Sequence, residues 1–397
     1  MDPNVSLSAF RLQRAVSVCG LHSLELLVAS LPENVEYLSG YFPVSVSALY
    51  SAEAYLVFKP STGEKALITS AADAPTLTEL GFEGTLFPVG SFCFRYEDGD
   101  TVSDSVREQL KIRYDSVSDA LASAITALGF SGGRIAMDES RMPVGTWNQV
   151  RKAFPDADFI EGAPVFRQIK YIKHPDETAL IKKSTNITEA SFQSLLPLIR
   201  QGISEEEMCQ AFYKGVMDQG AMPYFCTATV DKRSAFVDTY NHPLSTVKEG
   251  SVIRFDFGCI YKGFRSDIAR TVIAGENEKA ARYYCGILEG EEAAISALRP
   301  GVTAGEIFDT AVAAVRKTIP HYDRHHCGHG IGLACYDLPS ICPGSDVPIE
   351  KDMVLCIETP YYELGWGGVQ VEDTVLVTGQ GAEYLTESSR ELIYVEV

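Results

Sequence analysis

The sequence "DFGCIYKGFRSD" at residues 256–267 begins and ends with an aspartate and carries a turn-forming "YKG" between two apolar runs. The runs predict two strands, and the turn predicts a hairpin that brings Asp256 and Asp267 together. A carboxylate is costly to bury in such a run without a partner. A metal ion held by both side chains is a physically sufficient reason for the two aspartates to lie there.

A second pair of acidic residues follows the same pattern. Glu358 lies in "VLCIETP" and Glu372 in "VQVED", with the glycine-rich "ELGWGG" between them, which predicts another hairpin. His329 lies between the two hairpins in "GHGIG", where flanking glycines allow the backbone to approach closely. A salt bridge would explain any one of these acids alone. One imidazole and four carboxylates together suit a pair of bridged divalent ions better than a structural zinc.

The composition of the chain narrows the classes of protein. Its 397 residues suit two domains. Lysine plus arginine total 34 against 53 acidic residues, and a net charge of −19 argues against nucleic-acid and membrane partners. The first thirty residues lack a signal-peptide pattern, no stretch reaches eighteen apolar residues, and the ten cysteines form no CxxC pair. We therefore expect a cytoplasmic protein with reduced thiols.

The order of predicted elements places a domain boundary near residue 165. Before it, a helix at 8–23 and strands at 24–30, 54–60, 64–70 and 132–138 alternate in an α/β pattern, with a further helix at 143–154. After it, helices are predicted at 176–199 and 204–220, the second opened by Ser204 and Glu207 at capping-box spacing. Strand-like runs then follow from about residue 223, interrupted by a long helical region at 278–298. We expect domains at 1–165 and 166–397.

The order D-x10-D, GHGxG, "ET" and "VED" resembles the creatinase, prolidase and aminopeptidase P family. The resemblance covers nearly the whole second half, including "IKHPDETALIKKS", and extends weakly to "LPENVEYLSGY" in the first. It implies an α+β fold: a pita-bread catalytic domain, in which helices accompany a curved antiparallel sheet, preceded by a smaller α/β creatinase-type amino-terminal domain. It also implies a homodimer.

The same resemblance implies roles for the five residues. Asp256 would bind the first metal, Asp267 and Glu372 would bridge both, and His329 and Glu358 would bind the second. The cofactors would be two divalent ions per chain, manganese, iron or zinc. A hydroxide held between them would be the nucleophile and Glu358 its proton acceptor.

The sequence departs from the family pattern around "GLACYDLP". Tyr336 stands where the peptidases have a second histidine and Asp337 where they have a glutamate, while His325 and Pro339 agree with the pattern. A tyrosine keeps a hydrogen-bond donor but is a poor proton shuttle at neutral pH. It could hold an oxyanion, or it could be an aromatic wall residue. The metal half of the site is thus retained while its proton-handling half is altered.

Two further departures concern the other walls of the site. His242 lies about three residues nearer Asp256 than the family histidine in that segment, so it reaches the site only if the loop is shortened. Gln370 replaces the family's arginine beside Glu372 and removes a permanent positive charge. We expect His321 and His326 to be polar surface or supporting groups and not ligands.

Three functions remain open from the sequence. The first is a two-metal hydrolase that cleaves a C–N bond in a dipeptide or peptide end with proline, an Xaa-Pro dipeptidase or aminopeptidase. The second is the same scaffold with a non-standard small substrate, as in creatinase or ectoine hydrolase, or a lyase resembling dimethylsulfoniopropionate lyase. The third is a binding module, against which the intact ligand set argues. The altered walls favour a non-standard substrate within the hydrolase class.

Overall fold

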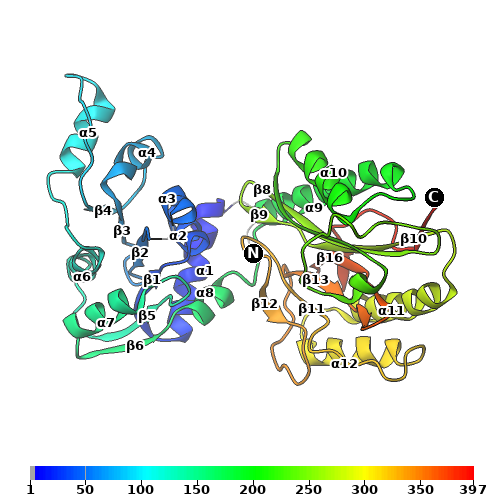
Figure 1. Cartoon of the computed structure of the whole chain (residues 1–397). Helices are drawn as coiled ribbons and strands as arrows, with labels where there is room; N and C mark the ends of the chain where they lie inside the picture. The colour runs from blue at the N-terminus through cyan, green and yellow to red at the C-terminus, as the bar shows by residue number, and fades with distance from the viewer. Residues whose placement is uncertain (1–4, 50) are drawn as a thin grey trace. The chain divides into compact units, whose positions relative to one another are not determined.

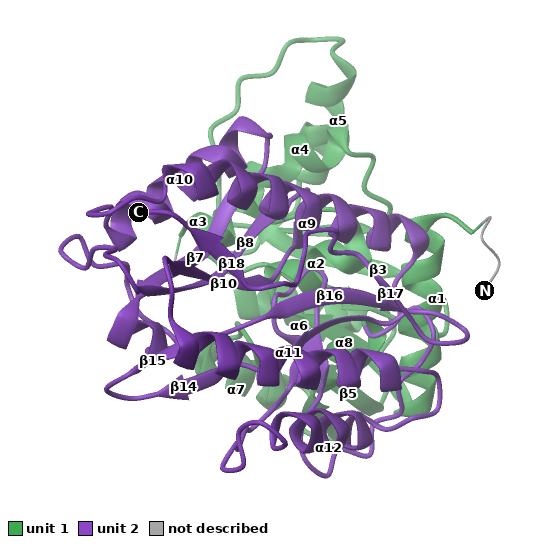
Figure 2. Ribbon diagram, turned by 90° about the vertical axis from the view of Figure 1, so that its right-hand side faces the viewer, with its two compact units in different colours: residues 1–170 green, residues 171–397 purple. Residues whose placement is uncertain are grey.

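The computed structural model describes residues 5–49 and 51–397, and these divide into two compact units, one ending at residue 170 and the other spanning residues 171–397 (Figure 2). Each unit has its own sheet and its own hydrophobic core.

The first unit is built on a mixed six-stranded sheet in the order β4-β3-β2-β1-β5-β6 (Figure 1). Its strands are β1 (Leu24–Ala29), β2 (Tyr55–Phe58), β3 (Lys65–Ser70), β4 (Thr85–Val89), β5 (Gly133–Met137) and β6 (Ala157–Glu161). Its helices are α1 (Leu7–Leu21), α2 (Pro32–Ser39), α3 (Val44–Ala48), α4 (Ala74–Glu79), α5 (Thr101–Gln109), α6 (Val117–Ala127), α7 (Val144–Ala153) and α8 (Ala163–Ile169), with a short 3-10 turn η1 (Ala71–Asp73). The strands predicted at 54–60 and 64–70 are present as β2 and β3, which pair antiparallel from Tyr55↔Ile68 to Phe58↔Lys65.

The second unit is built on a ten-stranded sheet whose main path runs β12-β11-β13-β16-β10-β8-β7. Its strands are β7 (Met222–Val230), β8 (Val252–Tyr261), β9 (Phe264–Arg265), β10 (Ile268–Ala274), β11 (Gly328–Gly330), β12 (Asp337–Ser340), β13 (Val354–Glu358), β16 (Glu372–Val377), β17 (Ala382–Tyr384) and β18 (Ile393–Val395), with β14 (Tyr361–Glu363) and β15 (Gly367–Val369) as a separate hairpin. Its helices are α9 (Pro175–Leu195), α10 (Glu205–Asp218), α11 (Glu278–Ala297) and α12 (Ala304–Val315), with 3-10 turns η2 (Leu196–Leu198) and η3 (Asp231–Ala235). The predicted capping box of Ser204 and Glu207 opens α10.

Strand β8 shows how the second unit separates its core from its polar face. Phe255 and Phe257 are fully buried in the cluster that α9 and α10 contribute to. Successive side chains of a strand point to opposite faces, so Arg254 and Asp256 point away from these helices. Figure 1 shows α9 and α10 along one part of the sheet and α11 with α12 along another. The acidic residues therefore share the face that the α9–α10 pair leaves uncovered.

The register of the strands brings the two predicted hairpins together. Both are present: β8 pairs antiparallel with β10 and β13 with β16. Asp256 lies opposite Ala269, which in turn lies opposite Glu372, and Glu372 lies opposite Glu358. The α+β class expected from the sequence is confirmed by this antiparallel sheet and its helices. Within the described residues, no helix combines the length and apolar character needed to span a bilayer.

Gly258 is the residue on which the first hairpin closes most tightly. A Cβ atom there would lie 2.0 Å from the carbonyl oxygen of Ser266 and 2.8 Å from the ring of Phe225. The backbone oxygen cannot move without opening the hairpin, so Gly258→Ala should lower the free energy of unfolding by about 2 kcal/mol or more. Denaturant unfolding measures the loss. Gly379→Ala, where a Cβ meets nothing within 4 Å, is the control and should change stability by less than about 0.5 kcal/mol.

Candidate metal centre

Four carboxylates and one imidazole from five places in the sequence lie close together in the second unit. Asp256 comes from β8, Asp267 directly precedes β10, and His329 comes from β11. Glu358 ends β13 and Glu372 begins β16. All except Asp256 are buried, and Asp256 is half-buried. The strand register thus assembles the set that was predicted to bind metal.

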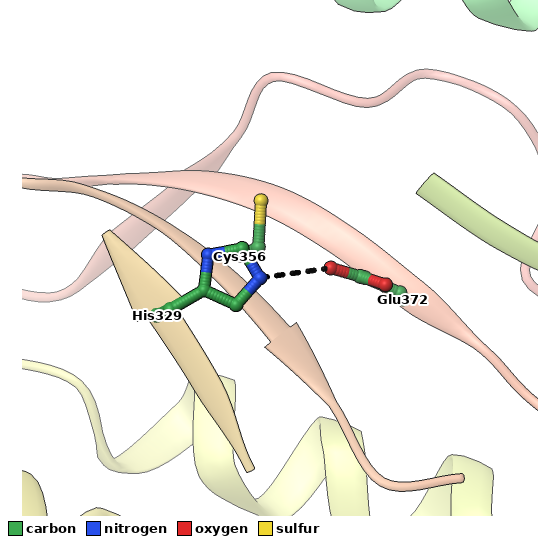
Figure 3. A group of neighbouring side chains, drawn as sticks. All are labelled: His329, Cys356 and Glu372. Carbon is green, nitrogen blue, oxygen red and sulfur yellow. Dashed lines mark ion pairs between the residues drawn. The ribbon is translucent and has the colours of Figure 1, made fainter. Parts of the chain in front are cut away.

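Two groups of three potential ligand atoms occur in this cluster, each with its atoms within 4.8 Å of one another. One group is Asp256, Asp267 and Glu372, and the other is His329, Cys356 and Glu372. Glu372 belongs to both. Figure 3 shows His329, Cys356 and Glu372 converging from three neighbouring strands. A carboxylate shared by two adjacent groups has the geometry that a bridging ligand needs.

The His329 ring is oriented for coordination through Nε2. Its Nδ1 lies 3.0 Å from the carbonyl oxygen of Gly330, which can only accept, so Nδ1 carries the proton and Nε2 the lone pair. Nε2 lies 3.6 Å from Asp267 Oδ2 and 3.8 Å from Glu372 Oε1 (Figure 3). Among the described residues neither His329 Nε2 nor Glu372 Oε1 has a hydrogen-bond partner. Both separations are shorter than two metal–ligand bonds of about 2.1 Å, so a divalent ion fits between these atoms.

Two glycines fix the backbone of the histidine strand. A Cβ atom on Gly328 would lie 2.2 Å from the carbonyl oxygen of Cys356, and one on Gly330 would lie 2.3 Å from that of Leu338. Gly328 also has a positive φ of 143°. Strand β11 is therefore pressed between β12 and β13, and this contact sets the position of His329.

The pKa values of the carboxylates in the cluster are shifted in the direction that reduces their negative charge, because the carboxylates are buried close together. Burial, reinforced by neighbouring carboxylates, raises the pKa values of Asp267 and Glu372 well above their usual range. Burial raises the pKa of Asp256 to about 6, while the charge of Arg254 acts to lower it. Burial lowers the pKa of His329, which favours its neutral form. Bound divalent cations would offset the repulsion and keep the carboxylates ionised.

Cys356 differs from the other members of its group. Its Sγ lies 3.6 Å from Thr374 Oγ1 and 3.8 Å from the carbonyl oxygen of Asp267. Burial, and then the nearby carboxylates, raises its pKa well above the usual range. Since a thiol binds metal as a thiolate, the carboxylates and the imidazole are the better ligands here.

Glu358 has a separate set of partners. Its carboxylate lies 3.5 Å from His326 Nδ1 and 3.6 Å from Arg324 Nη2, and it accepts a hydrogen bond of 3.2 Å from Gln370 Nε2. Burial, more than any neighbouring charge, lowers the pKa of His326 and so favours a neutral imidazole. Glu358 is thus held by one cation, one neutral ring and one amide.

A cavity of about 570 Å³ opens over the cluster. Tyr336 lines it and stacks on the His329 ring, with centroids 3.8 Å apart and planes at 23°. Tyr336 is 63% exposed, so a ligand in the cavity can reach its side chain. Partial desolvation, followed by the carboxylates, raises the pKa of Tyr336, and its hydroxyl stays a proton donor. Cys335 also lines the cavity and donates to Asp267 Oδ2 at 3.1 Å.

The structure places three other candidate residues outside the lining of this cavity. His325 is exposed and lines a neighbouring pocket with His321, whereas His326 takes the place beside Glu358. Asp337 is buried at the start of β12, in register with Gly330. His242 accepts a hydrogen bond from the backbone of Leu244 through Nδ1. Any influence of His325, Asp337 or His242 on the cluster would pass through neighbouring groups.

Comparison with known proteins identifies the family. The model of metallopeptidase family M24 matches residues 179–379, and that of the creatinase/prolidase N-terminal domain matches residues 11–172. The chain is 29% identical over 261 residues to an Xaa-Pro dipeptidase of Pyrococcus horikoshii, and this match covers 64% of this chain and 74% of that relative. It is 30% identical over 266 residues to an Xaa-Pro dipeptidase of Lactobacillus delbrueckii subsp. lactis, and this match covers 65% of this chain and 71% of that relative. A prolidase structure from Thermococcus sibiricus superposes with a TM-score of 0.83 at 24% identity, covering 99% of this chain and all of that one.

The chain belongs to metallopeptidase family M24. The pita-bread fold with a creatinase-type first domain is thereby confirmed, as is the expectation of a metal-dependent hydrolase with divalent metal cofactors. The lyase alternative finds no support in these relatives, and the binding-module alternative is set aside.

A buried ionic group lies directly behind β16. Asp373, next to Glu372, accepts a hydrogen bond of 2.8 Å from the buried Arg270. Glu291 on α11 is fully buried nearby. Burial, and then the charge of Asp373, raises the pKa of Glu291 well above its usual range, which favours the protonated carboxyl in the folded protein.

Glu291→Gln should stabilise the protein relative to wild type, and this difference in the free energy of unfolding should grow as pH rises. The unfolded chain releases the Glu291 proton above about pH 4.3, whereas the folded protein keeps it, so wild-type stability falls by up to about 1.4 kcal/mol for each pH unit. Glutamine has no such proton to lose. The free energy of unfolding of Glu291→Gln should therefore exceed that of wild type by a small amount at pH 4.5 and by a larger amount at pH 8. Thermal unfolding at both pH values measures it, with the exposed Glu292→Gln as control. An equal difference at both values would contradict a protonated Glu291.

Proposed function

We propose that this protein binds two divalent ions per chain, manganese, iron or zinc, and hydrolyses a C–N bond in a small substrate. Asp256 would bind the first ion, Asp267 and Glu372 would bridge both, and His329 and Glu358 would bind the second. The observation that supports this most directly is the pair of adjacent ligand groups that share Glu372. The unpartnered His329 Nε2, 3.6 Å from Asp267 Oδ2 and 3.8 Å from Glu372 Oε1, supports it further.

When bound, the ions would lower the pKa of water to give a nucleophile at neutral pH and would polarise the attacked carbonyl. The residues of the chain supply orientation and proton transfer. Glu358 would accept the proton of the attacking water on its carboxylate and pass it to the leaving nitrogen. Neutral His326, 3.5 Å away, could donate to that carboxylate, or accept from it once it carries the proton, and Arg324 lies 3.6 Å from it.

The substrate that we propose is a non-standard one for this family. The cavity of about 570 Å³ suits a molecule of dipeptide size. Its wall beside Glu372 presents the neutral amide of Gln370, and Tyr336 in place of a histidine presents a phenol. Both changes affect groups that would contact the substrate and leave the proposed ligands intact.

The second candidate is an Xaa-Pro dipeptidase, and the relatives that carry this name favour it. In that case the loss of the histidine at Tyr336 would be offset by another group, and His326 beside Glu358 is the nearest one. We also propose a homodimer, which rests on the family resemblance alone.

Replacing a proposed bridging residue should weaken the binding of both ions. Asp267→Asn and Glu372→Gln each remove a residue proposed to bridge the two ions, so bound metal should fall from about two equivalents to well below one for both variants. Elemental analysis of protein equilibrated with excess Mn²⁺ and then desalted measures this. Glu292→Gln, an exposed acid on α11, is the control. Full occupancy in either bridging variant, or less than one equivalent in wild type, would refute the dinuclear centre.

Tyr336 should contribute to turnover through its hydroxyl and not through its ring. Tyr336→Phe keeps the stack on His329, so metal content should not change, while turnover of the preferred substrate should fall by about ten- to a thousandfold. The substrate is sought in a panel of Xaa-Pro dipeptides, other dipeptides, N-acyl amino acids and guanidino acids.

We expect wild-type protein to cleave Xaa-Pro dipeptides slowly. Rapid cleavage of simple Xaa-Pro dipeptides, equal or improved in Tyr336→His, would instead favour the dipeptidase.

A further inference from the structure

Gln370 occupies a fixed place between β15 and β16. It is 1% exposed, and its backbone is bound twice by one side chain: Thr271 Oγ1 accepts from its N–H and donates to its carbonyl oxygen, both at 2.9 Å. These two contacts fix the backbone from which the side chain projects. Gln370 is also one of the residues that line the cavity over the metal centre.

Its neighbours determine how the amide of Gln370 is oriented. Oε1 accepts from Arg254 Nη1 at 2.8 Å and from the Tyr362 hydroxyl at 3.2 Å. Nε2 donates to Asp256 Oδ2 at 3.1 Å and to Glu358 Oε2 at 3.2 Å. The opposite orientation would place the amide NH₂ against a guanidinium and the oxygen against two carboxylates. The amide therefore links two proposed ligands of different metals.

Arg254 holds that amide from behind and does not contact the cavity. Its side chain is fully buried, and Nη1 also lies 3.4 Å from Asp256 Oδ2. Its other N–H groups donate to the backbone carbonyls of one segment, namely Ser234 (2.9 Å), Phe236 (2.7 Å) and Val237 (3.1 Å). A cation in this place cannot bind substrate. It can act through the groups it contacts, which are Gln370, Asp256, the segment 234–237 and the ring of Tyr362, whose centroid lies 5.3 Å from the guanidinium carbon.

We propose that Arg254 is a positioning residue for the metal centre, acting by orienting the Gln370 amide so that it holds Asp256 and Glu358 at a fixed separation. The positive charge that the family pattern has at position 370 lies here at Arg254 on β8, two strands from β16 in the sheet, and a neutral donor faces the cavity. Asp256 and Glu358 are thus prealigned by protein groups as well as by the ions. The inference rests on the ligand set of the proposed function.

The affinity of the protein for metal tests the proposed linkage between Arg254 and Gln370. Chelator-stripped protein is titrated with Co²⁺ by calorimetry and by visible absorption, which reports ligand geometry. Arg254→Met and Gln370→Met should each weaken binding of Co²⁺ by about 10- to 100-fold and shift the absorption bands, as loss of a group that orients a ligand does. The double variant should bind about as weakly as the worse single variant, because both changes remove one linkage.

Arg233→Met is the matched control. Arg233 directly precedes this segment and donates to the Tyr240 carbonyl at 2.6 Å and to Glu205 at 3.0 Å, and neither partner is a proposed ligand. It should leave Co²⁺ affinity within about threefold. If Arg254→Met does not fold, Arg254→Lys keeps the charge without the planar fork, and it should weaken Co²⁺ binding in the same direction.

The outcomes separate the two proposals. Two Co²⁺ bound by wild type, with unchanged affinity in Arg254→Met or Arg254→Lys, would overturn the positioning role alone. Losses that multiply in the double variant would also overturn it, since the two residues would then act independently. Fewer than one Co²⁺ bound by wild type would overturn the dinuclear centre and this inference with it.

Discussion

The cost of gathering negative charge in a low-dielectric interior is the constraint on which the second unit depends. Asp256, Asp267, Glu358 and Glu372 share one face of a sheet whose other face, at β8, is packed with aromatic side chains. Such a face is stable only when cations and hydrogen-bond donors compensate it. The donors of the chain lie at the edges of the cluster, and the space between His329, Asp267 and Glu372 is left for ions.

The parts of the site that were predictable from sequence are those set by strand periodicity. A turn between alternating runs fixes which residues face each other, and this placed Asp256 near Asp267 and Glu358 opposite Glu372. The cationic partners were not found, although the same reasoning was available. Arg254 interrupts the apolar run "SVIRFDFG" two residues before Asp256, and a buried guanidinium needs partners as much as a buried carboxylate does.

The histidines show a second limit of sequence reasoning. Agreement with the family pattern favoured His325 over His326, but the loop before β11 turns His326 toward Glu358 and exposes His325. No periodicity constrains an irregular loop, so the direction of each side chain depends on packing between segments distant in sequence. The stack of Tyr336 on His329 arose in the same way, from a connection between β11 and β12 that has no repeat.

The glycines that enclose His329 make one part of the site far less tolerant of substitution than its neighbour. Main-chain contacts hold the histidine at its place, and almost any side chain at Gly328 or Gly330 would displace it. The loop that follows, which supplies Cys335 and Tyr336, has no such restriction and forms the wall that a substrate meets. Mutations can therefore accumulate in the wall while the histidine stays in place. The shape of the substrate wall can therefore change without disturbing the backbone that holds the proposed ligand His329.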